Sequence, residues 1–496
     1  MEGKNINIPD VKRRNPLIDF RGNDTGLALN VKRIIGIVIA IAAPFLCSLL
    51  PLASYGEKAG LALGIVLSTM ALLICDVLSP GATGALFCFV SILCGIMDLS
   101  ALQDYVGNGL FFQVIGLCMV GYGIESTPFG SRLAYLVLYK LGSKPKRIVV
   151  AILVVTAVLS SVISNFATVA LMTTLIHAMM NEMGELPGKS RFGAACMLAT
   201  VAGANIGGMG FINGSIGVNL MAIGQINAGT TGDYNITPAQ WAMVGWTILI
   251  PLLVVVSFVL LHTIKFDPSS VNLLSKEFYK GKLDELGRIG GSEIRWLLTI
   301  IALLAFLLMG LNANILMLIF IPLVMAPCVG IMKSRDAFAK GVPWEVMFCM
   351  TTLGMLGTIF NNNGLADWIA DLVAPLISGF SPFVIMLLLT TLAGLLANLL
   401  VGGTYANITI CVAVVAPILE SLGLNPSIML MPSIILISFM LSLAPHATVF
   451  VNYVYGYYTQ KDLLVNGLLI TAAGIIISCL VCYFMAPLYW GTSIYI

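Results

Sequence analysis

Long apolar stretches make up most of this chain, and they constrain its fold more than any other feature. A helix needs about 20 apolar residues to cross the hydrocarbon core of a bilayer. Eleven stretches fit one crossing each: residues 34–54, 59–79, 81–98, 109–126, 190–211, 239–263, 295–311, 314–332, 344–361, 427–446 and 464–488. The sequence therefore predicts an all-α polytopic membrane protein.

Composition agrees with this fold class and excludes several functions. Hydrophobic residues make up 59% of the chain and charged residues 10%, whereas soluble domains contain about 25% charged residues. A net charge of +2 leaves no basic excess of the kind that nucleic-acid binding requires. The chain has no HExxH, GxSxG or Walker A motif, so we expect neither an enzyme nor catalytic residues.

Two further apolar stretches, residues 147–183 and 383–420, are too long for one helix, and polar or small residues interrupt each at its middle. We interpret them as re-entrant hairpins, which return to the side from which they enter. With the N-terminus in the cytoplasm, this arrangement puts 24 of the 25 Lys and Arg residues on the cytoplasmic side and only Lys58 outside. The charge distribution therefore predicts eleven transmembrane helices, two re-entrant hairpins and a C-terminus outside the cell.

The stretches Gln113–Gly184 and Trp344–Gly423 form an internal repeat. Each contains an apolar span, a turn with glycine and a hairpin, and the two hairpins enter from opposite sides. The tip residues Asn165 and Thr404 both lie 19 residues before the glycine that ends their stretch. Inverted repeats with broken helices are common in secondary transporters, where the binding site lies near the midplane of the membrane.

Each hairpin is followed by a span that breaks at a polar cluster, Asn205–Asn219 in the first half and Pro445–Asn452 in the second. Both clusters end in the pattern small–Ser/Thr–x–x–Val–Asn, which supports the repeat. The glycines of the first cluster could serve close helix packing, since small residues spaced by four are common between membrane helices. Their position directly after a Ser-Asn tip favours a binding site instead.

The open helix ends at such tips suit ions. Free N–H groups at a helix N-terminus attract an anion, and carbonyl, hydroxyl and amide oxygens suit Na+. No Lys or Arg lies in the interior of an apolar stretch, and Arg147, Arg191 and Arg295 stand at the ends of theirs. Glu125 could act as a proton relay, although its place at a span end fits an interfacial cap better. His446 could equally well serve the ligand or a structural hydrogen bond.

With these motifs, the chain resembles the divalent anion/sodium symporter family of the ion transporter superfamily, which includes dicarboxylate, citrate and sulfate carriers. The resemblance spans about residues 60–488 and is strongest at residues 162–168, 206–210 and 343–364. It implies a homodimer in which a transport domain moves against a scaffold domain by an elevator motion. It also implies Na+ as the coupling ion and a small anion as the substrate.

The resemblance assigns two cation sites, each made of hairpin-tip residues and backbone in the following break. The first would comprise Ser160, Ser164, Asn165 and Gly214. The second would comprise Gly403, Thr404 and Ala447. The second matches the family less well, because Gly403 stands for the tip serine and Thr404 for the tip asparagine.

The resemblance also assigns the residues that would contact the substrate. These are Asn165, Ser215, Thr404 and Thr448, together with Phe166 and Tyr405, which stand where the family has threonine. The prolines that the family carries in each break are missing here. The aromatic tips suggest a smaller or partly apolar anion, but a tip that shifts to use Thr168 and Asn407 would explain the same pattern.

Two functions follow from these residues as hypotheses. The intact first cation site favours Na+-coupled symport of a small carboxylate-type or sulfate-like anion. The altered second site gives weight to the alternative, a cation-independent anion exchanger on the same fold. In either case we expect a multi-pass protein of the inner or plasma membrane.

The expected domain organisation alternates between scaffold and transport elements. It comprises a cytoplasmic N-terminal segment (1–33), scaffold helices (34–108), transport repeat 1 (109–238, with the hairpin 147–183), scaffold helices with a cytoplasmic loop (239–343, loop 265–294) and transport repeat 2 (344–496, with the hairpin 383–420).

Overall fold

The structure, a computed structural model, is mostly helical in the residues that it describes. These are residues 31–75, 77–107, 127–141, 144–162, 165–212, 214–230, 236–269, 276–308, 333–342, 355–365, 379–399, 407–437 and 447–496, with a few short pieces between these ranges. Within them the one extended pairing is an isolated antiparallel bridge between Leu424 and Tyr495. The predicted all-helical fold is therefore confirmed for this part of the chain.

The helices of the first half are α1 (Val31–Ser48), α2 (Ala59–Ile74), α3 (Pro80–Leu93), α4 (Leu99–Gly107), α6 (Phe129–Leu141), α7 (Pro145–Val162), α8 (Asn165–Glu182), α9 (Arg191–Gly207), α10 (Ile216–Gly229) and α11 (Pro238–Thr263). Those of the second half are α12 (Lys276–Glu285), α13 (Gly291–Leu308), α15 (Ser334–Lys340), α17 (Leu356–Asn362), α19 (Pro382–Leu399), the π-helix η1 (Thr409–Ala413), α21 (Val415–Ser421), α22 (Pro426–Ile437), α23 (Ala447–Tyr453), α24 (Gln460–Phe484) and α25 (Ala486–Trp490).

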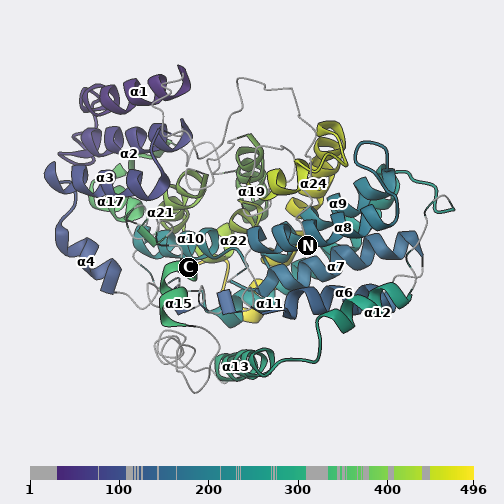
Figure 1. Cartoon of the computed structure of the whole chain (residues 1–496). Coiled ribbons are helices and arrows are strands. Elements are labelled where there is room, and N and C mark those ends of the chain that lie inside the picture. The colour runs from purple at the N-terminus through teal and green to yellow at the C-terminus, as the bar shows by residue number, and fades with distance from the viewer. Residues whose placement is uncertain are drawn as a thin grey trace.

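The helices form two groups joined by a central layer (Figure 1). On the left of the view, α2 packs against α1, α3 and α17. On the right, α7 and α8 pack against α9, and α23 packs against both α8 and α9. Between the groups, α10 contacts α17, α21 and α22, and α19 contacts α22 and α24. The broken elements that sequence analysis singled out thus lie together in the right-hand group and the central layer.

Three helices of the described part are long and apolar enough to cross a membrane, namely α7, α11 and α24. Helices α11 and α24 correspond to the predicted spans 239–263 and 464–488, although α24 begins earlier, at Gln460. Helix α7 was expected to be one arm of the hairpin 147–183, and at 18 residues it is about 27 Å long. The number of spans and both hairpins therefore remain predictions.

Span ends differ from the prediction where a residue stops the helix. The predicted span 34–54 corresponds to α1, which ends at Ser48, shortly before Pro51, whose ring has no N–H and restricts the residue before it. The described part of the predicted span 427–446 is α22 (Pro426–Ile437), and residues 438–446 lie outside the described residues. The spans 109–126 and 314–332 lie largely or wholly outside the described residues.

Residues 163 and 164, at the tip of the first predicted hairpin, lie outside the described residues. Helix α7 ends at Val162 and α8 begins at Asn165. The tip of the second hairpin lies outside the described residues. The glycines that end the two repeats agree, because Gly184 follows α8 with φ of 75° and Gly423 follows α21 with φ of 71°. Both adopt the left-handed conformation that favours glycine at helix C-termini.

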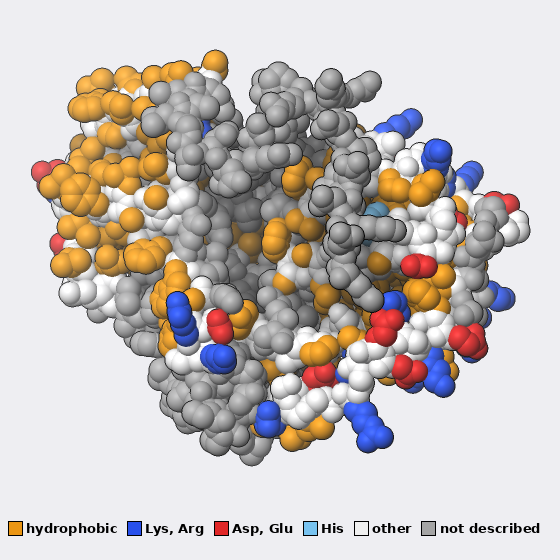
Figure 2. All heavy atoms as spheres, viewed as in Figure 1, with side chains coloured by type: hydrophobic (Ala, Val, Ile, Leu, Met, Phe, Trp, Pro, Cys, Tyr) orange, Lys and Arg blue, Asp and Glu red, His pale blue; other side chains and the backbone are white. Residues whose placement is uncertain are grey.

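The surface is apolar where a soluble protein would be polar. Figure 2 shows hydrophobic side chains spread over α1, α2 and α3, while charged side chains gather at the right and lower edge, around α12. Phe45 is 74% exposed and Leu93 is 73% exposed. Monomeric soluble proteins rarely expose contiguous apolar patches of large area. These helices are therefore suited to contact with lipid.

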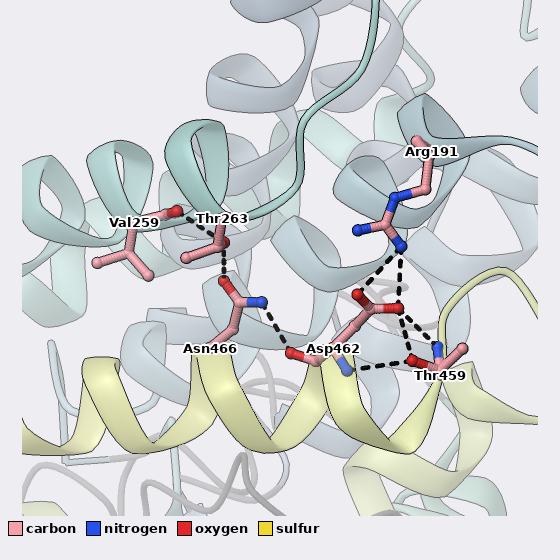
Figure 3. Close-up of polar contacts among 6 residues, drawn as sticks. All are labelled: Arg191, Val259, Thr263, Thr459, Asp462 and Asn466. Carbon is pink, nitrogen blue, oxygen red and sulfur yellow. Dashed lines mark hydrogen bonds and ion pairs between the residues drawn. The ribbon is translucent and has the colours of Figure 1, made fainter.

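One end of the right-hand group is fastened by polar contacts between α9, α11 and α24 (Figure 3). Arg191 donates to both carboxylate oxygens of Asp462 at 3.0 Å, and Asp462 also forms a capping box with Thr459 at the start of α24. One turn further, Asn466 accepts a hydrogen bond from Thr263 at the end of α11. Helix α11 is thereby held against α24.

A buried ion pair ties α6 to the start of α13. Arg132 Nε donates to Glu293 Oε2 at 3.1 Å, and its Nη atoms donate to the carbonyl oxygens of Gly287 (2.9 Å) and Leu286 (3.2 Å). The side chain of Glu293 is 4% exposed. The Arg132 guanidinium thus donates hydrogen bonds both to the Glu293 carboxylate and to main-chain carbonyl oxygens of the loop that precedes α13.

Replacing Arg132 by alanine is expected to reduce the free energy of unfolding by about 3 kcal/mol, because Glu293 would remain buried without a partner. The matched control is Lys282→Ala, which removes the exposed pair between Lys282 and Glu285 and should leave stability nearly unchanged, because exposed ion pairs contribute little. Thermal midpoints of the two variants in detergent provide the measurement. A shift of the thermal midpoint in Arg132→Ala as small as that in Lys282→Ala would show that the Arg132–Glu293 pair does not stabilise the fold.

Candidate functional site

The candidate site centres on Ser160 and Asn165, on either side of the interruption between α7 and α8. Ser160 Oγ lies 3.0 Å from Asn165 Oδ1 and 2.6 Å from the carbonyl oxygen of Ala204 on α9. Ser160 is fully buried and Asn165 is 8% exposed. A hydroxyl carries one proton and can fully satisfy only one of these two acceptors. Ala204 O also accepts from Gly208 N–H at 3.2 Å, and three neutral oxygens therefore meet in one buried place.

Backbone from the turn between α9 and α10 completes this place. Asn165 N–H, the first donor of α8, donates to Gly214 O at 3.2 Å. A Cβ on Gly208 would lie 2.2 Å from Asn165 Oδ1, and a Cβ on Gly214 would lie 2.7 Å from Ser160 O. Only glycine allows the turn to approach the side chains this closely. Three of the four residues predicted for the first cation site, Ser160, Asn165 and Gly214, are thus brought together.

Neighbouring glycines serve packing instead. A Cβ on Gly203 would lie 2.6 Å from Leu153 O, and a Cβ on Gly207 would lie 2.3 Å from Ala157 O. Both contacts are with the backbone of α7, so these glycines let α7 and α9 approach closely. Gly203 and Gly207 therefore pack helices, whereas Gly208 and Gly214 border the candidate site, where the binding interpretation stays a prediction.

The oxygen set fits Na+. Its members are a hydroxyl, an amide oxygen and a main-chain carbonyl, which are hard and uncharged ligands of the kind that Na+ accepts. In the part of the chain that the structure describes, no three His, Cys, Asp or Glu residues come together as a site for a transition metal would require. Ser160 Oγ, Asn165 Oδ1 and Ala204 O could hold the ion, with the backbone at Gly214 beside them. The Ala204 carbonyl has no side-chain signature, and the sequence could not single it out.

The other predicted residues of the first repeat lie at different depths. Phe166 follows Asn165 on α8 and is 52% exposed, whereas Thr168 is fully buried and its Oγ1 has no hydrogen-bond partner among the described residues. Ser215 is half-buried next to Gly214, at the start of α10. Ser164 lies outside the described residues. Phe166 and Ser215 are thus the substrate candidates adjacent in sequence to the oxygen set, while Thr168 faces the interior.

The second repeat is only partly described. Gly403, Thr404 and Tyr405 lie outside the described residues, and so do His446 and Glu125. Ala447 is the first residue of α23, and its backbone alone is described. Asn407 is fully buried, with Nδ2 donating to Ala393 O at 3.1 Å and Oδ1 accepting from Cys411 Sγ at 3.1 Å. The amide nitrogen and the amide oxygen of Asn407 thus both form hydrogen bonds within the stretch 383–420.

The two predicted breaks contact each other. Thr448 Oγ1 donates to Asn205 Oδ1 at 3.0 Å. Of the asparagines that end the two motifs, Asn219 donates from Nδ2 to Ile212 O at 3.1 Å within its own break. Asn452 instead donates from Nδ2 to Thr173 Oγ1 on α8, in the other repeat, at 2.6 Å. The shared sequence pattern signalled these asparagines, but it did not reveal that Asn205 would meet the other half of the chain.

Comparison with known proteins places the chain among transporters. A family model described as "Citrate transporter" matches residues 65–410. The sodium-dependent dicarboxylate transporter SdcS of Staphylococcus saprophyticus is 24% identical over 526 aligned positions, which cover 99% of this chain and 98% of the relative. The transporter of the same name from Staphylococcus aureus is 24% identical over 432 positions, 80% of each chain.

A solved structure supports the fold. The YdaH transporter of Alcanivorax borkumensis has a TM-score of 0.52 and 13% sequence identity, and the match covers 82% of this chain and 98% of that one. The predicted resemblance to the divalent anion/sodium symporters is confirmed by the family model and the relatives, and the expectation that the protein is no enzyme is confirmed with it. Because the family model matches more than half of its length, this chain belongs to the citrate transporter family and is a multi-pass membrane transporter.

Proposed function

We propose that the protein is a Na+-coupled symporter of a small anion, with one Na+ held between α7, α8 and the turn that follows α9. The observation that carries this proposal is the buried meeting of Ser160 Oγ, Asn165 Oδ1 and Ala204 O beside Gly214. The curated relatives are named sodium-dependent dicarboxylate transporters, which supports both the ion and the class of substrate.

The geometry suggests how cation and anion would depend on each other. Asn165 is the first residue of α8, so an ion held by its amide lies at the N-terminus of that helix. The first turn of a helix presents N–H groups without partners in the helix, which attract anions. A cation at the same helix end adds to that positive potential and offsets the cost of placing an anion inside the membrane. Anion binding is therefore expected to require Na+.

The substrate class follows from the relatives and from the exposed ring beside the oxygen set. We propose a small carboxylate-type anion, with a sulfate-like anion as the second choice. Phe166 is half-exposed next to the buried Asn165, so an anion at the N-terminus of α8 would lie beside an aromatic ring. An anion with an apolar portion fits this surface better than one with charge on every side.

We also propose an elevator motion of a homodimer, with the N-terminus in the cytoplasm and the C-terminus outside. The broken elements α7–α10 and α19–α23 would form the moving body, together with α24, and α1–α4 would belong to the scaffold. Helix α11 packs against α7, α9 and α24, so we place it with the moving body. This shifts the proposed domain boundary from residue 238 to the end of α11. The second cation site at Gly403, Thr404 and Ala447 remains part of the proposal.

Thermal stabilisation of the purified protein tests the proposed function. Succinate, malate, citrate and sulfate would each be added in Na+, K+ or choline buffer. A ligand stabilises the folded state by mass action, by about 2.7 kcal/mol at one hundred times its dissociation constant. We expect at least one of the carboxylates to raise the thermal midpoint by several degrees in Na+ buffer and to leave it unchanged in K+ or choline buffer. Equal stabilisation in choline would contradict symport and favour the cation-independent exchanger.

A further inference from the structure

A hydrogen bond between the two predicted breaks lies directly behind the candidate cation site. Thr448 Oγ1 on α23 donates to Asn205 Oδ1 on α9 at 3.0 Å, across 243 residues of sequence. Asn205 is 1% exposed and Thr448 is 6% exposed. Asn205 follows Ala204, whose carbonyl oxygen accepts from Ser160. One end of this contact therefore belongs to the peptide that borders the cation site, and the other belongs to the opposite repeat.

A second contact of the same type lies one helical turn further along α23. Asn452 Nδ2 donates to Thr173 Oγ1 on α8 at 2.6 Å and lies 3.4 Å from Met197 Sδ on α9. Both Asn452 and Thr173 are fully buried. Thr173 lies eight residues after Asn165 on α8, which corresponds to about 12 Å along the helix. The chain thus offers a matched pair of Asn–Thr contacts, one at the site and one remote from it.

The peptide group that joins Ala204 to Asn205 connects the candidate cation site to the hydrogen bond between Asn205 and Thr448. The Ala204 carbonyl and the Asn205 N–H belong to one planar unit and turn together. Ala204 O accepts from Ser160 Oγ and from Gly208 N–H, so a cation that takes this carbonyl as a ligand would compete with both bonds. The resulting shift of the peptide would move the main chain from which the Asn205 amide extends. The amide oxygen in turn accepts from Thr448, a residue proposed to contact the anion. Hydrogen bonds in a buried place of low dielectric are strong enough to transmit such a shift.

We propose that Asn205 is a positioning residue that couples cation binding to anion binding, by linking the Ala204 carbonyl to Thr448 on α23. The inference rests on the proposed function and deepens it, since it names the link between the two ligands. Asn205 itself touches neither ligand in this proposal. Its effect is on the coupling, which is the factor by which Na+ raises the affinity for the anion and the anion raises the affinity for Na+.

The experiment measures that coupling factor by calorimetry. The dissociation constant of the tightest-binding anion among succinate, malate, citrate and sulfate is determined in Na+ and in choline, for the wild type and for each variant. Asn205→Ala and Thr448→Val are expected to reduce the coupling factor about tenfold, while Na+ alone still stabilises the protein. Thr448→Ser keeps the hydroxyl and is expected to retain the coupling that Thr448→Val loses.

The matched controls are Asn452→Ala and Thr173→Val, which break the remote contact. They are expected to lower the thermal midpoint and leave the coupling factor unchanged. An unchanged factor in Asn205→Ala would overturn the inference, and so would an equal loss in Asn452→Ala, because a general loosening of α23 would then explain both. If Asn205→Ala does not fold, the contrast between Thr448→Val and Thr448→Ser decides. A wild-type protein with no Na+ dependence contradicts the proposed function itself, which is a separate result.

Discussion

Replacement of Asn165 by alanine is expected to abolish Na+-driven uptake into proteoliposomes while leaving membrane insertion intact. The change removes Oδ1, which lies 3.0 Å from Ser160 Oγ, but keeps the backbone N–H that donates to Gly214 O. A polar contact to a charged group contributes about 1.5–3 kcal/mol, and loss of about 3 kcal/mol lowers an affinity roughly 100-fold. Na+-induced thermal stabilisation should therefore disappear at Na+ concentrations that saturate the wild type.

Asn181→Ala is the matched control for this variant. Asn181 lies at the other end of the same helix, where its Nδ2 contacts the ring of His177 at 3.1 Å. Its replacement removes an amide from α8 without touching the oxygen set, so uptake and the Na+ response should stay close to those of the wild type. Normal uptake by Asn165→Ala would show that the cation is bound elsewhere in the protein.

Gly208→Ala is expected to eliminate the Na+ response by filling the site. The new Cβ would lie 2.2 Å from Asn165 Oδ1 and 2.7 Å from Asn165 Nδ2, so the amide must turn away from Ser160. Overpacking of this kind costs about 1–3 kcal/mol of stability. We therefore expect a lower thermal midpoint in choline and no additional stabilisation when Na+ replaces choline.

Gly394→Ala provides the comparison, because it adds the same methyl group to another apolar helix, α19. Its Cβ would lie 3.5 Å from the nearest atoms, on Ile475 and Thr471, which is an ordinary contact distance. Alanine is favoured over glycine in a helix interior by up to about 1 kcal/mol, so this variant should keep its Na+ response at equal or higher stability. A wild-type Na+ response in Gly208→Ala would exclude the oxygens around Asn165 as the cation ligands.

Local sequence signals predicted the parts of the fold that local physics decides. Helix α7 is described to Val162 and α8 from Asn165, and the two residues between them, which lie outside the described residues, belong to the small and polar middle of an apolar stretch where the sequence predicts a hairpin tip. The glycines at 184 and 423 end their helices because both adopt a left-handed conformation. Helix ends were less accurate, as at Ser48, because hydropathy continues beyond the residue where Pro51 prevents a further turn.

The residues of the candidate site likewise divide into those that the sequence could predict and those that only the structure identifies. Ser160, Asn165 and Gly214 were predictable because the resemblance ties them to motifs of characteristic residue types. The Ala204 carbonyl was not, since every residue has a carbonyl and only a close neighbour such as Ser160 Oγ, at 2.6 Å, distinguishes this one. Helix α11 shows the same limit, because its apolar sequence is equally compatible with scaffold or moving body, and its contacts with α7, α9 and α24 favour the latter.

By itself, the sequence determined that this protein is a helical membrane protein, and it directed attention to the small and polar residues in the middle of the stretch 147–183. These properties depend on apolar run length and on residue type, which are both local. The tertiary structure alone decided that Asn205 meets Thr448 across 243 residues, and that Gly208 closes on Asn165. Such contacts depend on how helices pack in three dimensions, and packing leaves no periodic trace in the chain that would identify the partner.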